Sequence, residues 1–306
     1  MRRCSVIIVT YNSGMQIEAC VRALASQDCE IIVVDNVSSD DTATRVRGLA
    51  DEITLTLLAQ DRNLGFAGGV NEGARVAAGE TLLILNPDAI AETGAVDALL
   101  SCLSVPNIAA AGGALLDENG SPERGFSFRR LPTLASLLFE VLLINQLWPA
   151  NPVNRRYRCL DADLTGEQEI EQPAGACLAV KRATWENAGG MDTQFYPVWF
   201  EDVDLCLRLK KTNARIIYCP WARFHHGGAH SLGKLAFEDK QVFWYTNMLR
   251  YVSKHFSAGA VLALRAGIVA GMGLRMLACF LGSKPADVSR NAAVKSYWKV
   301  AKIAMS

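Results

Sequence analysis

Ser5-Val-Ile-Ile-Val9 decides the fold, because this run and its repeat at 30–34 set the order of the elements. Both runs are short, apolar and rich in β-branched side chains, which is typical of strands buried on both faces of a parallel sheet. Between them lie a polar loop, Thr10-Tyr-Asn-Ser-Gly14, and a helical pattern from about 15 to 25. The order strand, loop, helix, strand predicts an α/β protein with an open sheet flanked by helices.

The later part of the chain continues this pattern and then departs from it. Further buried strands are predicted at 81–85, 109–113, 172–180 and 216–219. The mixed segment from about 122 to 172 is interpreted as an insertion in a main domain, 1–235. Beyond that domain the pattern is helical throughout, so 236–306 is predicted to be a C-terminal helical segment.

Composition and missing motifs exclude several classes of protein. The 306 residues include 31 basic and 31 acidic side chains, and this balance argues against nucleic-acid binding. Nine scattered cysteines without a CxxC pair favour reduced thiols and a cytoplasmic protein. The first apolar run is too short for a signal peptide. A dinucleotide oxidoreductase and a Walker-type NTPase both lack support, since neither GxGxxG after the first strand nor GxxxxGK[ST] is found.

Polar residues follow the first two predicted strands, at the sheet edge where open α/β proteins bind their ligands. Thr10, Asn12, Asp35 and Asn36 all fall at such strand ends. The Asp35 carboxylate can accept a hydrogen bond from a ribose hydroxyl or from a base N–H. The alternative is that Asp35 and Asn36 only shape a turn.

A glycine-rich stretch at 60–73 is a second candidate for ligand contact. Gly65 allows the backbone to approach a ligand closely. Arg62 and Asn63 can donate to a base or a phosphate, and a helix is predicted to begin near Phe66. The alternative is a glycine-rich helix start that serves only close packing.

Two further motifs suggest a metal site. Asn86-Pro-Asp88 directly follows a predicted strand, and one hard oxygen ligand there suits Mg²⁺ or Mn²⁺ bridging a diphosphate. The same tripeptide is also a common turn. His225 and His226 follow the last strand, with His230 close behind, and adjacent histidines beside glycines predict a ligand or phosphate-contact loop.

The stretch from 199 to 210, which contains Glu201 and Asp202, combines two carboxylates with an amphipathic helical pattern. A carboxylate near a helix start is favoured in its ionised form by the helix dipole, which suits a general base. The alternative is that Asp202 only caps the helix. Trp199 belongs to an aromatic wall ahead of these acids, and the small Gly175 lets the backbone approach a substrate.

Together, and in this order, the motifs resemble the inverting family 2 glycosyltransferases of GT-A fold, and within them the rhamnosyltransferase branch of bacterial cell-wall and O-antigen polysaccharide synthesis. The motifs that carry the resemblance lie at 6–12, 32–36, 62–71, 85–88, 189–192, 200–206 and 224–228. The likeness covers positions 4 to 235 and implies a GT-A sheet with the C-terminal helices as an appendage.

The resemblance implies a role for each candidate residue. Asp88 would be the last acid of the family's DXD signature and bind Mg²⁺ or Mn²⁺ with His225, or with His226 as its rival. Asp202 would be the base, and Glu201 would shape the acceptor site, with Gly175 and Trp199 contacting acceptor or sugar. The nucleotide would be held by Thr10, Tyr11, Asn12, Asp35, Asn36, Arg62, Asn63, Gly65, Phe66 and Asn86. Asn86 departs from the signature, where the family usually has an acid.

The resemblance also implies a reaction. A sugar, with L-rhamnose from dTDP-rhamnose as the preferred candidate, moves to a hydroxyl of a glycan or of a polyprenyl-diphosphate-linked acceptor in a single inverting displacement. A UDP-hexose donor and a non-catalytic nucleotide-sugar-binding protein are the alternatives. A nucleotidyltransferase is disfavoured, because its N-terminal glycine- and lysine-rich signature is missing.

The apolar segment 257–282 carries Arg265 and Arg275, which make a buried membrane-spanning helix costly. An interfacial helix at the inner face of the bacterial cell membrane is one interpretation. Helices packed on the core and a homodimer contact are the others.

Overall fold

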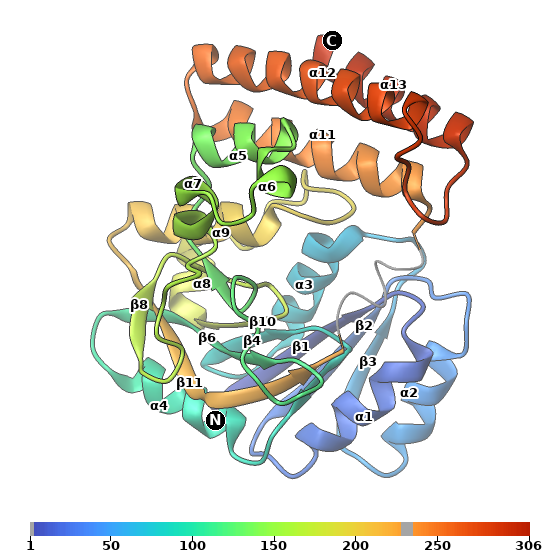
Figure 1. Cartoon of the computed structure of the whole chain (residues 1–306). Coiled ribbons are helices and arrows are strands. Elements are labelled where there is room, and N and C mark those ends of the chain that lie inside the picture. Colours follow the sequence, from blue (N-terminus) through green and yellow to red (C-terminus); the bar gives the residue numbers. More distant parts are fainter. Residues whose placement is uncertain (1–2, 228–234) are drawn as a thin grey trace. The chain divides into compact units, whose positions relative to one another are not determined.

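The structure is a computed structural model that describes residues 3–227 and 235–306 (Figure 1). His230 therefore lies outside the described residues. The chain forms two compact units, which are described separately below. The sheet unit comprises Met1–Leu131, Arg158–Gln194 and Glu201–Gly233, and the helical unit comprises Pro132–Tyr157, Phe195–Phe200 and Lys234–Ser306.

Within the described residues, the sheet unit contains a nine-stranded mixed sheet in the order β3-β2-β1-β4-β10-β6-β11-β5, with β8 paired to β11 (Figure 1). Its strands are β1 (Cys4–Thr10), β2 (Glu30–Asp35), β3 (Leu55–Ala59), β4 (Thr81–Leu85), β5 (Ala89–Ala91), β6 (Ile108–Leu116), β8 (Gln168–Ile170), β10 (Cys177–Lys181) and β11 (Arg215–His226). A small second sheet pairs β7 (Phe128–Arg129) with β9 (Gln172–Pro173). The helices of this unit are α1 (Gly14–Leu24), α2 (Thr42–Ala50), α3 (Gly65–Val76), α4 (Ala95–Ser104), α8 (Arg182–Ala188) and α9 (Glu201–Lys211).

The strand register places the predicted ligand-binding ends together. β1 runs parallel to β2 and β4, with Thr10 opposite Asp35 and Ile8 opposite both Val33 and Leu85. β10 runs antiparallel to β4 and to β6, which makes the sheet mixed. This architecture confirms the predicted α/β class and the open sheet flanked by helices.

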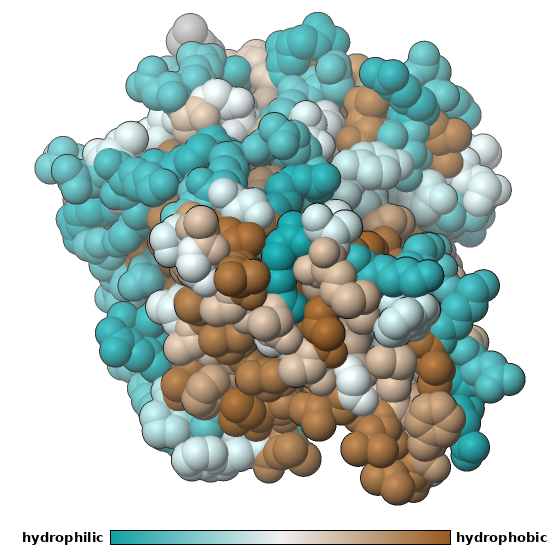
Figure 2. All heavy atoms as spheres, turned by 90° about the horizontal axis from the view of Figure 1, so that it is seen from above, coloured by the Kyte–Doolittle hydropathy of each residue, from teal (hydrophilic) through white to brown (hydrophobic). Residues whose placement is uncertain are grey.

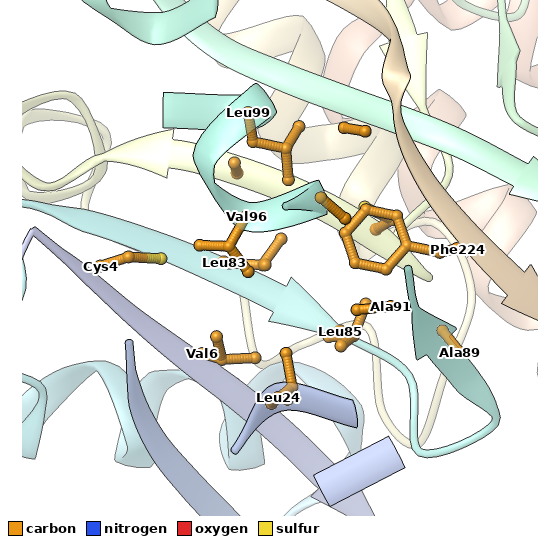
Figure 3. Packing of buried hydrophobic residues seen from close by; sticks show 14 of the residues in the cluster. Cys4, Val6, Leu24, Leu83, Leu85, Ala89, Ala91, Val96, Leu99 and Phe224 are labelled. Carbon is orange, nitrogen blue, oxygen red and sulfur yellow. The ribbon is translucent and has the colours of Figure 1, made fainter. Parts of the chain in front are cut away.

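The central strands are buried on both faces, as their uninterrupted apolar sequences predict. Val6 and Ile8 of β1 belong to one apolar cluster with α1, α2 and α4, whereas Ile7 and Val9 belong to a second cluster with α3 and α9. Figure 3 shows part of the first cluster, in which Leu83 and Leu85 of β4 lie among side chains from α1, α4 and β11. The sheet is thus fixed by apolar packing on both sides, and its edge is left for polar groups.

The last strand is longer than the sequence analysis expected. A loop was predicted at the histidines, but β11 continues through His226. The strand shifts register between Cys219 and Arg223, which accommodates Pro220 and its missing N–H. Beyond the shift β11 pairs with β5, and His225 lies opposite Ile90. The two histidines are therefore consecutive strand residues, whose side chains extend to opposite faces.

The helical unit contains α5 (Leu134–Val141), α6 (Ile144–Leu147), α7 (Pro152–Tyr157), α11 (Phe237–His255), α12 (Ala258–Phe280) and α13 (Arg290–Met305). It takes in residues 132–157 and 195–200, which the sequence analysis assigned to the main domain 1–235. The reason is close packing of α5 on α12. A Cβ on Gly267 would overlap Leu138, and one on Gly271 would overlap the carbonyl of Val141.

Two glycines in helices of the sheet unit test this account of the packing. A Cβ on Gly73 of α3 would overlap the Ile7 side chain of β1, whereas a Cβ on Gly48 of α2 would meet no atom within 4 Å. We expect Gly73→Ala to lower the free energy of unfolding by about 1–3 kcal/mol through overpacking. Gly48→Ala should raise it by up to about 1 kcal/mol through helix propensity. Urea unfolding of both variants measures the difference, and equal effects would contradict the close approach of α3 to β1.

Candidate active site

The carboxyl ends of β1 and β2 are joined by a network around Asp35. The Thr10 hydroxyl donates to Asp35 Oδ1 at 3.0 Å, and the backbone N–H of Ser38 donates to Oδ2 at 3.1 Å. The Ser38 hydroxyl also donates to Oδ1, at 2.5 Å. Asp35 is buried, so these donors stabilise its charge. The network shapes the turn after β2 and also leaves a charged acceptor at the sheet edge.

The neighbouring asparagines organise the adjoining loops. The Asn12 side-chain oxygen accepts from the backbone N–H of Ser39 at 2.7 Å. Asn36 donates to the carbonyl of Gly65 at 3.0 Å and accepts from the N–H of Leu64 at 3.2 Å, and Asn63 accepts from the N–H of Gly65 at 2.8 Å. The start of α3 is therefore tied to the end of β2.

The remaining predicted nucleotide contacts differ in their exposure. Tyr11 and Arg62 are exposed, and Phe66 is half-buried. Gly65 has φ +71°, in the region that favours glycine. The structure thus brings the strand-end residues and the α3 start to one edge of the sheet unit.

Asp88 and His226 form the second part of the edge. Both are buried, and His226 Nε2 lies 3.7 Å from Asp88 Oδ1. Among the described residues, His226 Nε2 has no hydrogen-bond partner. The other ring nitrogen, Nδ1, lies 3.3 Å from Glu123 Oε1, and the ring stacks on Phe126 with centroids 5.1 Å apart. The imidazole is therefore fixed on one side and open toward Asp88 on the other.

His225 has different surroundings. Its Nε2 lies 2.9 Å from Glu92 Oε1, and its side chain is about half exposed. The two adjacent histidines thus serve separate carboxylates on opposite faces of β11. Within the described part of the chain, no group of three or more His, Cys, Asp or Glu side chains is arranged to hold a metal ion by itself.

Asp202 lies in the first turn of α9 and is held by three donors. The backbone N–H of Gly175 donates to Oδ2 at 2.9 Å, and Gln172 Nε2 donates to the same oxygen at 3.2 Å. The N–H of Val203 donates to Oδ1 at 2.8 Å. Burial raises the pKa of Asp202, while the N–H groups of Gly175 and Val203 and then the charge of Arg129 oppose the rise. A raised pKa makes the carboxylate a stronger base.

Glu201 is the more deeply buried of the two acids. Burial, and then repulsion from Asp202, raises the pKa of Glu201 well above its ordinary value. Its Oε2 atom is buried and has no hydrogen-bond partner in the described structure. These surroundings favour the neutral carboxylic acid, whose O–H can donate a hydrogen bond.

Hydrogen bonds at the strand ends connect the surroundings of Asp88 with those of Asp202. The N–H of Asn86, two residues before Asp88, donates to the carbonyl of Ala176 at 3.0 Å. Ala176 directly follows Gly175, which holds Asp202. On the other side, Arg129 lies over the ring of Phe126, 5.8 Å from its centroid, and Phe126 stacks on His226. Residues far apart in the sequence are thereby gathered at one edge.

Sequence reasoning missed four residues of this edge: Glu123, Phe126, Gln172 and Ser38. None of the four stands in a motif with a recognisable spacing, and Glu123 and Phe126 fall in the segment interpreted as an insertion. Arg129 is one of six arginines in that segment, and nothing in the sequence separates it from the others. Their roles follow from contacts that only the fold creates.

Trp199 belongs to the helical unit, where α11 fixes the segment 195–200. Asn247 donates to the carbonyl of Val198 at 2.8 Å, and the rings of Trp199 and Trp244 lie edge to face at 5.7 Å. Trp199 and Phe200 both have left-handed φ angles, 78° and 75°. The backbone directly before Glu201 is therefore strained, which occurs frequently at functional sites.

Trp199 also lines a cavity of about 720 Å³ within the helical unit. The cavity walls combine aromatic rings with cationic side chains and one carboxylate. These residues are Trp199, Phe237, Trp244, Tyr245 and Tyr297, together with Lys240, Arg275, Lys284 and Glu140. The volume is typical of a site for a small molecule.

Comparisons with known proteins identify the family of this chain and agree with its fold. The family model described as glycosyl transferase family 2 matches residues 5–153. The N-acetylglucosaminyl-diphospho-decaprenol L-rhamnosyltransferase of Mycobacterium tuberculosis is 30% identical over 244 residues, which are 75% of this chain and 77% of that protein. The rhamnosyltransferase WbbL of Escherichia coli is 24% identical over 186 residues, 60% of this chain and 66% of that protein.

A solved structure shows the same fold. The mannosyltransferase PcManGT of Pyrobaculum calidifontis, in complex with GDP-Man and Mn²⁺, superposes with a TM-score of 0.57 over 98% of this chain and 86% of that chain, at 17% identity. The sheet unit therefore has the GT-A architecture of nucleotide-sugar transferases. The chain belongs to glycosyltransferase family 2, and it is a glycosyltransferase.

The buried Glu201 carboxyl predicts a pH-dependent stability. Its pKa in the folded state is raised above 4.5, the ordinary value, so its contribution to stability is present below pH 4.5 and is lost as pH rises through the raised pKa. We expect Glu201→Gln to gain stability over the wild type with rising pH, by about 1.4 kcal/mol for each unit by which the pKa is raised. Urea unfolding across this pH range measures it. The exposed Glu118→Gln is the control, and a pH-independent difference for Glu201→Gln would contradict the buried neutral acid.

Proposed function

We propose that this glycosyltransferase moves a sugar from a nucleotide-diphosphate donor to an acceptor hydroxyl by a single inverting displacement, with Asp202 as the general base. The observation that carries the proposal is the placement of Asp202. Its carboxylate is fixed by the N–H of Gly175, at the same strand ends that carry Asp88 and His226. The alternative interpretation, a simple helix cap, leaves unexplained why Gln172 and Gly175, from outside α9, also bind this carboxylate.

The chemistry follows from the state of the two acids. An acceptor hydroxyl is a weak nucleophile, so Asp202 takes its proton as the oxygen attacks the anomeric carbon. The diphosphate departs from the opposite face of the sugar, which inverts the anomeric centre without a covalent intermediate. Glu201, kept neutral by burial, donates a hydrogen bond to the acceptor and so helps to orient its hydroxyl.

The residues Asp88 and His226 fit a divalent cation. A proton on Nδ1 of His226 would be donated to Glu123, and Nε2 would then present its lone pair toward Asp88. A carboxylate behind a metal-binding histidine is the usual supporting arrangement. Asp88 and His226 would therefore hold the metal, and not His225, which faces Glu92. When bound, the cation neutralises the charge of the departing diphosphate.

The nucleoside fits the network at the ends of β1 and β2. The buried Asp35 carboxylate remains able to accept from a base or ribose, because each carboxylate oxygen has two acceptor positions. Tyr11 and Arg62 are exposed nearby in sequence and are candidates for base stacking and phosphate contact. The donor is proposed to be dTDP-rhamnose, since relatives from two bacteria are named rhamnosyltransferases. A UDP-hexose is the competing donor.

The acceptor is proposed to be lipid-linked through a diphosphate. The name of the mycobacterial relative specifies such an acceptor for that protein. In this chain, the cavity lined by Trp199 pairs aromatic rings with Lys240, Arg275 and Lys284, which suits an apolar group that carries phosphate. A non-catalytic nucleotide-sugar-binding protein is disfavoured by the position of the carboxylate of Asp202.

Replacement of the base tests the reaction. We expect Asp202→Asn to lower the transfer rate by about 10²- to 10⁴-fold, because an amide cannot accept the proton. Donor binding should remain close to that of the wild type. Purified protein would be assayed with dTDP-rhamnose and a panel of UDP-hexoses, and binding followed by thermal shift. Unchanged turnover in the variant would remove Asp202 from the base role, and turnover with a UDP-hexose alone would refute the rhamnosyl donor.

The adjacent histidines provide a matched pair for the metal site. His226→Ala should weaken Mn²⁺-dependent binding of dTDP by about 10- to 100-fold, since it removes a ligand to the metal. His225→Ala should leave that binding unchanged, because His225 contacts Glu92. A Mn²⁺ titration followed by isothermal calorimetry of dTDP binding measures both variants. The opposite ranking would reassign the ligand to His225.

A further inference from the structure

Helix α12 presents a continuous apolar stripe on its exposed face. The large side chains of the stripe recur at helical spacing, from one end of the helix to just beyond the other. They are Leu262, Leu274, Leu277, Phe280 and Leu281, with exposures of 69%, 46%, 55%, 65% and 80%. Between Leu262 and Leu274 only small exposed residues, Ala266, Ala270 and Gly273, lie on this face. The stripe therefore extends for about 27 Å without a charged side chain.

The other face of α12 is fixed inside the helical unit. α5 packs against Gly267 and Gly271, and Arg275 donates to the carbonyl of Val141 at 2.6 Å. Arg265 donates to the carbonyl of Ala304 in α13 at 3.0 Å. Within the described residues, α12 is the one helix that is long and apolar enough to cross a membrane, yet only 28% of its apolar window is buried. Helix α12 is therefore packed along one face and exposed along the other.

The helical unit also has a strong positive charge. It carries 13 Lys and Arg residues against four Asp and Glu, whereas the rest of the chain carries 18 against 27. α13, which packs beside α12, exposes Lys295, Trp298 and Lys302, and the Lys302 ammonium lies over the Trp298 ring at 5.7 Å. Figure 2, seen from the α12 and α13 side of Figure 1, shows a broad hydrophobic area.

We propose that the helical unit docks on an anionic lipid bilayer, with α12 lying in the plane of the interface. The stripe would enter the headgroup and acyl boundary, and the lysines of α13 would meet anionic headgroups. Tryptophan beside lysine is the composition favoured at such boundaries. The excess positive charge of the helical unit favours a negative surface over an isologous contact with a second copy, which would bring two like-charged units together.

This docking is independent of the sugar-transfer reaction, so it is tested without donor or acceptor. The protein would be floated with vesicles of phosphatidylcholine alone and with vesicles that also contain phosphatidylglycerol. We expect binding to the anionic vesicles, with affinity falling as salt is added. Leu274→Gln/Leu277→Gln/Phe280→Gln should lower that affinity at least tenfold. Met15→Gln, which changes an even more exposed apolar side chain in the sheet unit, should leave it unchanged.

A second variant separates charge from hydrophobicity. Lys295→Glu/Lys302→Glu should weaken binding to anionic vesicles and flatten its dependence on salt. Thermal unfolding confirms that each variant is folded, and Phe280→Gln alone serves if the triple variant is not. Alkaline carbonate should release the wild type from membranes, as expected for a surface helix.

Three results would overturn the proposal. The first is equal flotation of the wild type and a folded stripe variant. The second is retention after carbonate extraction, which would indicate a spanning helix. The third is that the wild type sediments as a dimer and the stripe variant as a monomer, while neither protein binds vesicles. That result would make the stripe a contact between two copies of the chain.

Discussion

One hydrogen bond, from the N–H of Gly175 to the carboxylate of Asp202, connects the sheet to the carboxylate that we propose as the base. It fixes the first turn of α9 against the turn before β10. That turn is connected to the end of β4, because the N–H of Asn86 donates to the carbonyl of Ala176. A Cβ on Gly175 would lie 3.2 Å from Asp202 Oδ2, so the close approach depends on the absence of a side chain there. The position of the proposed base is thus set by backbone, which is the least mobile support available.

The adjacent acids Glu201 and Asp202 differ in the groups that surround them. Asp202 keeps three N–H donors, which offset part of the cost of burying its charge. Glu201 has an oxygen without a partner in the described structure, and its pKa rises further. Two consecutive carboxyls therefore differ in their surroundings: N–H donors oppose the rise in the pKa of Asp202, whereas burial and the charge of Asp202 raise the pKa of Glu201 well above its ordinary value. The adjacent histidines also contact different carboxylates, because the side chains of consecutive residues in a β-strand extend to opposite faces.

The balanced composition of the chain conceals a separation of charge. The net charge is zero, but the helical unit carries 13 basic side chains against four acidic ones, whereas the rest of the chain carries 18 against 27. An acidic sheet unit is compatible with the proposed site, in which a cation would help to hold a diphosphate. A basic helical unit with a bare apolar helix is suited to a different environment. The sheet unit and the helical unit therefore differ in charge within one polypeptide.

The local pattern of residues predicted the α/β class, the strands β1, β2, β4, β6, β10 and β11 and most candidate residues at the sheet edge, because buried parallel strands leave a period and a composition that local reading detects. It also placed Asp88, Asp202 and the two histidines among the candidates. The strands β3, β5 and β8 were not predicted. Only the tertiary structure separated His226 from His225, brought Glu123, Phe126 and Gln172 to the edge, and moved α5 into the helical unit. These outcomes depend on contacts between residues far apart in the chain, and such contacts leave no periodic signal in a single sequence.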